Sequence, residues 1–279
     1  MTRALYGLRI RQPIGGDFGL SGDLIRHVLE GDDWTSDVSR FGIDIWLTTT
    51  ALTGGFAVCQ ARLGAKVHDP KDPGADLGPM VRQVVSTTLR LAVRHADRWL
   101  GVHGSHDVPS YGFERFADPP SLEVDVLRLL TEFQAASLAM GATWRSMLSR
   151  ETATETLRLA ERAGEVADAG RRQLALEARD GVAPTTAMMS EALATFAFPD
   201  DIWARVIYDL VIAARDDESA IPEMVAGLTP IYLGRVGAFV IENRGLTTDQ
   251  AEDRVERQAR EFEREKPYLV DRWRAGVPA

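Results

Sequence analysis

The chain contains 279 residues, of which 45% are hydrophobic and 26% charged, and its formal net charge is −9 at pH 7. This length allows one large hydrophobic core or two modest ones, and the composition is not that of a disordered chain. The negative balance gives little general affinity for nucleic acid or for an anionic membrane, since both require clustered Lys and Arg. The single cysteine, Cys59, excludes a disulfide framework, and its apolar surroundings predict a core position in a protein of a reducing compartment.

No apolar stretch approaches the roughly 20 residues that span a bilayer, and the sequence MTRALYGLRI lacks the apolar core and cleavage site of a signal peptide. We therefore expect a soluble, cytoplasmic protein. The first predicted element is a strand over 5–12, with Tyr6 and Leu8 on one face and Arg9 and Arg11 on the other.

Four elements of α/β character follow in the part of the chain before residue 78. They are a glycine-rich turn (12–23), a short helix (22–29), a helix ended by paired glycines (43–53) and a strand (56–63). After Pro79, apolar residues recur at spacings of three and four, which predicts a long helix that ends by Gly101.

The segment 102–120, VHGSHDVPSYGFERFADPP, is rich in helix-breaking residues and separates this helix from the rest of the chain. It predicts a boundary between a region 1–102 and a helical region 119–279 without strands. Helices are predicted at 121–148, 150–179, 185–197, 200–215, 222–243 and 247–264.

Serines are placed to begin two of these helices, Ser121 and Ser149, and Gly181 is placed to end one. The helix 247–264 interleaves both charge signs with few apolar residues, and a solvated helix is its simplest interpretation. The expected fold class is therefore mainly α, with a small mixed α/β part at the N-terminus.

The sequence QPIGGDFG (12–19) carries the first candidate site residues. Its paired glycines, Gly15 and Gly16, let the backbone approach a ligand closely or adopt positive φ, and the carboxylate of Asp17 is suited to sugar hydroxyls. The alternative is a tight strand-to-helix turn in which Asp17 hydrogen-bonds its own backbone.

Two further candidates lie at the ends of predicted elements. Asp44 falls in the first turn of the helix 43–53, where the helix dipole favours an anion by about 0.3–1 kcal/mol, so a capping role and a site role both account for it. His68 ends an apolar strand and is followed by the loop DPKDPG. An imidazole at a strand end is a common metal ligand, and a satisfied or surface histidine is the alternative.

The order of these segments resembles the second half of a GT-A glycosyltransferase catalytic domain. QPIGGDFG, then FGIDIWL, then ARLGAKVHDP and a long helix are similar to the motifs of the retaining enzymes that make mannosylglycerate and glucosyl-3-phosphoglycerate. The resemblance spans residues 5–95. It implies a partial GT-A domain followed by a helical domain, in an enzyme that transfers a hexose from a nucleotide-sugar to a small acceptor such as an anionic glycerate.

The resemblance also implies a role for each candidate residue. Asp44 would be the catalytic carboxylate beside the reacting sugar, and His68 would bind a divalent cation, Mg²⁺ or Mn²⁺, that holds the donor diphosphate. Such a metal would neutralise the charge that develops on the leaving nucleoside diphosphate. The substrate-binding residues would be Gly15, Gly16, Asp17 and Lys71.

Four cations near the proposed site favour an anionic acceptor, although simple solvation explains them more economically. These cations are Arg9, Arg11, Lys66 and Lys71. The GT-A fold also requires an N-terminal α/β half with an Asp-x-Asp motif, which these 279 residues lack. Asp32 and Asp33 lie in a predicted loop and are not expected to replace it.

Two classes of function therefore stay open. The first is the C-terminal portion of a sugar transferase, inactive as this chain alone, whose helices cover the acceptor site or form a homo-oligomer surface. The second is a non-enzymatic helical binding or assembly module. An in-frame upstream segment with an Asp-x-Asp motif would distinguish the first from the second.

Overall fold

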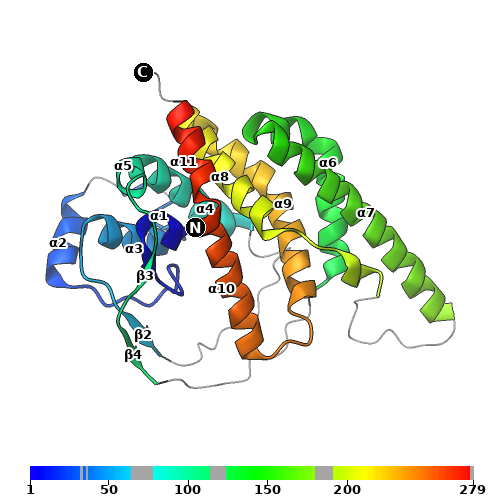
Figure 1. Ribbon diagram of the computed structural model, residues 1–279, viewed down its shortest axis with the longest axis horizontal. Helices are drawn as coiled ribbons and strands as arrows, with labels where there is room; N and C mark the ends of the chain where they lie inside the picture. Colours follow the sequence, from blue (N-terminus) through cyan, green and yellow to red (C-terminus); the bar gives the residue numbers. More distant parts are fainter. Residues whose placement is uncertain (32–33, 36, 64–77, 114–123, 180–190, 277–279) are drawn as a thin grey trace.

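The structure is a computed structural model that describes residues 1–31, 34–35, 37–63, 78–113, 124–179 and 191–276 (Figure 1). Helices make up most of it, and all the strands of the described residues lie between Leu8 and Gly112. The expectation of a mainly α protein with a small α/β part near the N-terminus is therefore confirmed.

The first element is a helix, and the strand predicted over 5–12 is wrong for most of its length. Helix α1 (Thr2–Tyr6) ends at Gly7, which has a left-handed φ of 75° and donates its N–H to the carbonyl of Arg3. Glycine adopts this conformation at little steric cost, so it ends the helix, and the chain continues as the short strand β1 (Leu8–Arg9).

The other strands are β2 (Gln60–Arg62), β3 (His106–Asp107) and β4 (Ser110–Gly112). β1 pairs in parallel with β3, and β2 pairs in parallel with β4, so the described residues form two separate two-stranded ladders. The strand predicted over 56–63 is thus shorter than expected. Cys59, just before β2, is exposed, and its predicted core position is wrong, because a two-stranded ladder buries little on either face.

Helices α2 (Gly22–Glu30) and α3 (Ile43–Thr53) agree with their predictions. The Ser21 hydroxyl caps α2 by accepting from the N–H of Leu24, and Gly54 follows the last residue of α3. A small apolar cluster lies between these helices and α4 (Gly78–Arg94). Its buried members are Leu24, Val28, Val38, Trp46, Ala51 and Leu91.

The main core is shared across the boundary predicted at 102–119. Leu89 of α4 and Trp99 of α5 (Ala96–Trp99) pack in one cluster with Leu5 of α1 and with many residues beyond 124. The division of the chain into two domains stays a prediction, and the described residues place the N-terminal helices on the core of the C-terminal ones.

The C-terminal region contains helices and 3-10 turns and, within its described residues, no strand. They are α6 (Val126–Met147), α7 (Arg150–Arg179), η1 (Leu193–Thr195), α8 (Asp200–Asp216), η2 (Glu218–Ala220), α9 (Ile221–Glu242), α10 (Thr248–Arg264) and α11 (Lys266–Ala275). α6 packs against both α7 and α9, and α4 packs against α8 and α9 (Figure 1).

Most of the predicted helices in this region are present, with corrections at three places. Ser149 caps α7 as predicted, since its hydroxyl accepts from the N–H of Thr152 at 3.1 Å. Asp125 caps α6, while the predicted caps Ser121 and Gly181 lie outside the described residues. The helix predicted over 185–197 is wrong in its described part, which holds η1, and α11 was not predicted.

α9 corrects the expectation that no segment is apolar enough to span a bilayer. The 25 residues Glu218–Glu242 are long and apolar enough by length and composition, with a mean hydropathy of 1.6 in their most apolar window. Here the helix lies inside the main core against α6, and a soluble core helix passes the same test. Cytoplasmic localisation stays a prediction.

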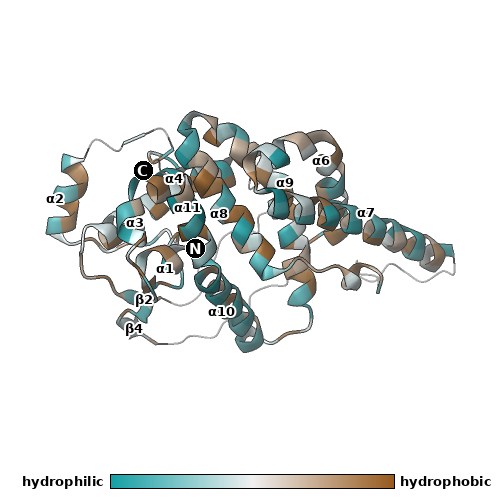
Figure 2. Cartoon of the chain, turned by 45° about the horizontal axis from the view of Figure 1, so that its top comes forward, coloured by the Kyte–Doolittle hydropathy of each residue, from teal (hydrophilic) through white to brown (hydrophobic). Residues whose placement is uncertain are grey.

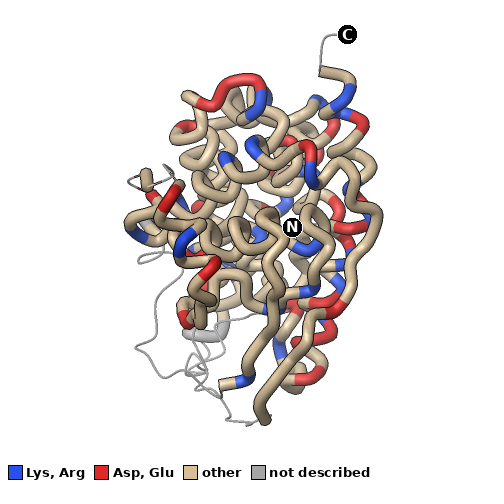
Figure 3. The backbone as a smooth tube through the Cα atoms, turned by 90° about the vertical axis from the view of Figure 1, so that its left-hand side faces the viewer, with Lys and Arg blue, Asp and Glu red and all other residues tan. Residues whose placement is uncertain are grey.

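α10 is hydrophilic along its length (Figure 2), and one side of it is exposed, as the predicted solvated helix requires, while the other side contacts neighbouring elements. Its Glu256 and Glu263 both accept hydrogen bonds from Arg3, which is only 8% exposed. On another face Arg254 pairs with Asp200 of α8 at 2.8 Å. Acidic and basic residues are interspersed along the backbone (Figure 3). Those of α10 form ion pairs with α8 and with residues near the N-terminus.

We expect Gly42→Ala to lower the free energy of unfolding by about 1–3 kcal/mol, because the added methyl group overpacks a closed site. A Cβ at Gly42 would lie 2.3 Å from Thr87 Oγ1 and 2.7 Å from the carbonyl oxygen of Asp37. Gly19→Ala is the control, since nothing lies within 4 Å of its Cβ position. Urea denaturation of both variants measures the difference, and equal stabilities would contradict the close contact.

Candidate functional site

The glycine-rich turn lies against the helix that carries Asp44. The Thr48 hydroxyl of α3 donates a hydrogen bond of 2.7 Å to the carbonyl oxygen of Pro13. Asp44 precedes Thr48 by one helical turn, so their side chains share one face of α3. The chain that leads into Gly15 and Asp17 is therefore held on the Asp44 side of this helix.

The turn itself has the conformation that its glycines permit. The N–H of Gly15 donates to the carbonyl of Gln12 at 3.2 Å, and Gly16 has a left-handed φ of 75°. Asp17 follows in an exposed position, whereas Asp44 is half-buried in the first turn of α3. The conformation of the glycines agrees with a turn, while the hydrogen bond from Asp17 to its own backbone and a binding role for Asp17 both stay predictions.

Two further contacts anchor the start of the turn. Arg11 donates from Nε and Nη2 to the carboxylate of Glu252 on α10, both at 2.7 Å, and this hydrogen bond lowers the pKa of Glu252. The side-chain amide of Gln60, at the start of β2, accepts from the N–H of Arg11 at 2.6 Å and donates to the carbonyl of Arg9 at 3.4 Å. The end of β1 and the start of β2 are thus tied together.

These contacts correct the interpretation of the cations near the site. Arg11 is engaged by Glu252, and Arg9 donates to Ser105 at 3.0 Å and lies 3.6 Å from Asp107. An anionic acceptor at either arginine would therefore compete with a carboxylate that is already next to it. Lys66 and Lys71 lie outside the described residues.

The predicted metal ligand, His68, also lies outside the described residues. Among the residues that the structure describes, no group of three or more His, Cys, Asp or Glu side chains is placed to hold a metal ion. The described residues therefore do not by themselves fit a divalent cation. The convergence of Asp17, Asp44 and His68 on one site stays a prediction.

A hollow of about 520 Å³ lies elsewhere, between the first turns of α7 and α8. Its volume is within the range of small-molecule sites. Its two arginines are accompanied by three acidic residues, so it has no dominant charge. The lining residues are Arg150, Glu151, Thr154, Glu155, Asp201, Ile202 and Arg205.

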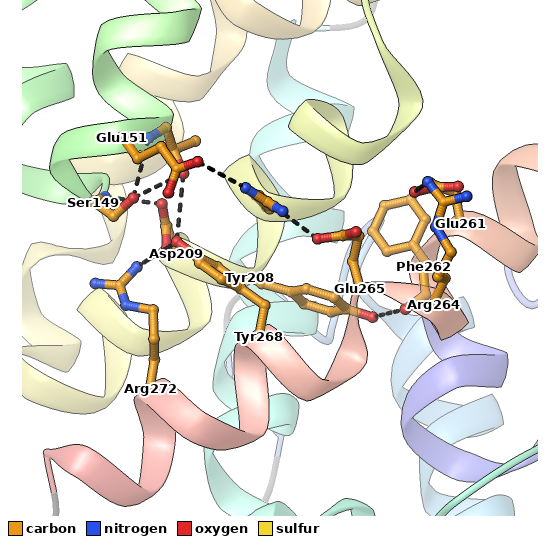
Figure 4. Close-up of polar contacts among 12 residues, drawn as sticks. Ser149, Glu151, Tyr208, Asp209, Glu261, Phe262, Arg264, Glu265, Tyr268 and Arg272 are labelled. Carbon is orange, nitrogen blue, oxygen red and sulfur yellow. Dashed lines mark hydrogen bonds and ion pairs between the residues drawn. The ribbon is translucent and has the colours of Figure 1, made fainter.

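A buried polar cluster that the sequence did not indicate surrounds Asp209 of α8 (Figure 4). Asp209 is 1% exposed, and its carboxylate accepts from the N–H of Ser149 at 2.8 Å and from the Tyr268 hydroxyl at 2.6 Å. The guanidinium of Arg272 also donates to it. The one available signal was a single Asp inside the apolar run IYDLVIAA.

The same close-up shows how the cluster continues along α8 and the C-terminal helices (Figure 4). Arg205 donates to Glu265 at 2.7 Å and lies over the ring of Tyr268, 5.3 Å from its centroid. The buried Tyr208 hydroxyl donates to the carbonyl of Phe262. Because the buried carboxylate of Asp209 is engaged by three donors, we assign Asp209 a structural role. Arg205 also lines the 520 Å³ hollow.

Lys266, at the start of α11, predicts a pH dependence of stability. Its ammonium donates to the carbonyl of Val102, and burial lowers its pKa to about 8 from the ordinary 10.5, an effect that nearby Glu263 opposes. At a pH between about 8 and 10.5, Lys266 is protonated in the unfolded chain and largely deprotonated in the folded chain. Raising the pH through this window therefore favours folding.

The free energy of unfolding of the wild type, minus that of Lys266→Met, should therefore rise between pH 8 and 10. Below pH 8 the lysine is charged in both states, so the difference should be flat there. Urea denaturation at several pH values measures both curves. A difference that falls with pH above 8 would contradict the lowered pKa.

Comparison with protein-family models, curated proteins and solved structures found no match to this chain.

Proposed function

We propose that this chain is the C-terminal portion of a hexosyltransferase that uses a nucleotide-sugar donor and a small acceptor. The observation that carries the proposal is the 2.7 Å hydrogen bond from Thr48 to Pro13. It ties the glycine turn to Thr48, which directly follows the motif FGIDIWL and lies one helical turn beyond Asp44. An active site built from both motifs requires this proximity.

In this proposal each candidate residue keeps the role that the resemblance implies. Asp44 positions or activates the acceptor hydroxyl, or stabilises positive charge at the anomeric carbon. His68 would hold the divalent cation together with ligands from other parts of the protein. The residues that contact donor sugar and acceptor would be Gly15, Gly16, Asp17 and Lys71.

A non-enzymatic helical binding or assembly module is the second candidate. It is favoured by the pairing of Arg9 and Arg11 with residues of this chain, and by the absence of Asp17 and Asp44 from the lining of the 520 Å³ hollow. In that case Asp44 has a structural role at the start of α3, which includes the favourable interaction with the helix dipole.

Substitutions at Asp44 and His68 distinguish the two candidates. We expect this chain alone to bind nucleotide-sugar and Mn²⁺ weakly and to lack transferase activity. In a chain extended upstream through an Asp-x-Asp segment, Asp44→Asn and His68→Ala should each lower kcat by a hundredfold or more, about 3 kcal/mol of transition-state stabilisation. High metal concentration should partly rescue His68→Ala, and it should not rescue Asp44→Asn.

Asp249→Asn is the matched control, because Asp249 is an exposed carboxylate in the first turn of α10 and loses the same dipole interaction. Calorimetric titration of nucleotide-sugars and a radiolabelled-sugar transfer assay with glycerate-like acceptors are the measurements. Tight donor binding by the short chain, or full activity of the extended chain carrying both substitutions, would show that the transferase proposal is wrong.

A further inference from the structure

Helix α6 has an exposed face that carries no charged residue. Its buried side packs on α7 and α9. Between Glu132 and Arg145 the sequence is FQAASLAMGATW, which contains no Asp, Glu, Lys or Arg. The exposed residues of this stretch recur at spacings of three and four, so they share one face of the helix. They are Ala135, Leu138, Ala139 and Ala142.

This face differs from the outer faces of the neighbouring helices. A surface helix normally has charged or polar side chains on the side away from the core. The exposed residues of α7 follow this rule, since they include Arg158, Glu161, Glu165 and Asp168. Leu138 of α6, in contrast, is 80% exposed. Because alanine and leucine both favour helix formation, composition alone does not require a partner, and the charges at the ends of the face are the further evidence.

These two charges have opposite signs and are available for a partner. Glu132 is 42% exposed and lies 4.0 Å from Arg128, a distance that makes this exposed pair a weak one. Arg145 donates to the carbonyl of Gly141 at 3.2 Å, and among the described residues no carboxylate pairs with it. The uncharged face therefore ends in an acidic residue on one side and in a basic residue on the other.

We propose that this face of α6 binds the same face of a second copy of this chain, in an antiparallel dimer with a two-fold axis between Leu138 and Ala139. In this register Leu138 of each copy lies level with Ala139 of the other. Glu132 of each copy lies level with Arg145 of the other, within reach of its long side chain. A two-fold interface repeats every such pair twice, so the dimer contains two of these ion pairs.

The size of the side chains suits a close contact between the two helices. Alanine side chains allow the helix axes to approach to about 8 Å, at the short end of the usual range. At this distance Leu138 of one copy packs between Ala135 and Ala142 of the other. The contact removes from water the leucine that is exposed in the single chain, which is a favourable change.

A second copy is the occupant that the charges favour. The chain has a formal net charge of −9, so two copies repel each other, and they do so least where the contact itself is uncharged. A strongly basic or acidic partner finds no opposite charge along the middle of this face. α6 lies at the end of the molecule opposite α2 (Figure 1). The proposal does not depend on the transferase function, because the face shares no residue with the candidate site.

Sedimentation equilibrium of the full chain between about 1 μM and 1 mM tests the dimer. We expect a concentration-dependent and weak monomer–dimer equilibrium, because one pair of helices buries less area than a standard interface. Leu138→Glu should raise the dimer Kd by about tenfold or more. Leu176→Glu is the matched control, since Leu176 is a leucine of α7 that is 58% exposed, and it should leave the Kd unchanged. Circular dichroism confirms that both variants fold.

A charge swap tests the antiparallel register. Glu132→Arg and Arg145→Glu should each raise the dimer Kd by about threefold or more, and the double variant should recover the wild-type value. A mixture of the two single variants should dimerise more tightly than either variant alone, because only the mixed dimer has both ion pairs. A chain that stays monomeric up to about 1 mM overturns the proposal. Equal effects of the two leucine variants, or no recovery in the double charge variant, overturn it as well.

Discussion

Asp209→Ala is expected to lower the free energy of unfolding by about 3–5 kcal/mol, which is the usual cost of removing one partner of a buried ion pair. The side chain of Asp209 is fully buried, and three donors converge on it from α7 and α11. Without the carboxylate, the N–H of Ser149 and the hydroxyl of Tyr268 lose their acceptor. Arg272 is left with its charge uncompensated in a half-buried position.

The control for this substitution is Asp216→Ala, at the end of the same helix. Asp216 is exposed and pairs with its neighbour Arg215, so we expect a change within about 0.5 kcal/mol. Asp209→Asn keeps the shape of the side chain and one acceptor oxygen. Its loss of free energy of unfolding should lie between those of Asp209→Ala and Asp216→Ala. Urea denaturation followed by circular dichroism measures all three, and a loss below about 1 kcal/mol for Asp209→Ala would contradict the structural role of the cluster.

Arg235→Leu is expected to have the second largest effect, a loss of about 3 kcal/mol, for a related reason. Arg235 lies in the apolar helix α9, is 4% exposed, and donates to Asp200 at 2.8 Å and to Glu242 at 3.3 Å. The substitution removes one of two arginines that pair with these largely buried carboxylates. Among the ion pairs of the described helices, Arg254 is then their remaining arginine partner.

Arg257→Leu is the matched control, since Arg257 is an exposed arginine of α10 and its loss should change stability little. A double-mutant cycle with Asp200→Asn isolates the pair, and we expect the second substitution to cost less in the Arg235→Leu background. Strictly additive losses in this cycle would show that the two side chains are not coupled.

Local signals account for the parts of the fold that were predicted correctly. The bounds of α3 follow from an apolar helical run that ends at paired glycines, and α7 begins where Ser149 offers a cap. Each of these signals acts within one or two helical turns, so it is visible in the sequence. The strand predictions failed because strand pairing is not a local signal. β1 and β2 are two and three residues long, and their partners, β3 and β4, lie far along the chain.

The candidate site was likewise predictable from the sequence only in part. The residue types of the glycine turn and of Asp44 are evident in the sequence, and so is their place at the ends of elements. Their proximity is not, because it depends on Thr48 reaching Pro13, 35 residues away.

The sequence by itself thus determined the helical character of this protein, most helix ends and the residues worth testing. The tertiary structure alone decided which charged groups from distant parts of the sequence meet. Arg11 finds Glu252 at a separation of 241 residues, and Asp209 finds Arg272 at a separation of 63. The physical reason is that a helix period reports which face is apolar, whereas the partner of a polar side chain depends on how the packed elements bring distant faces together.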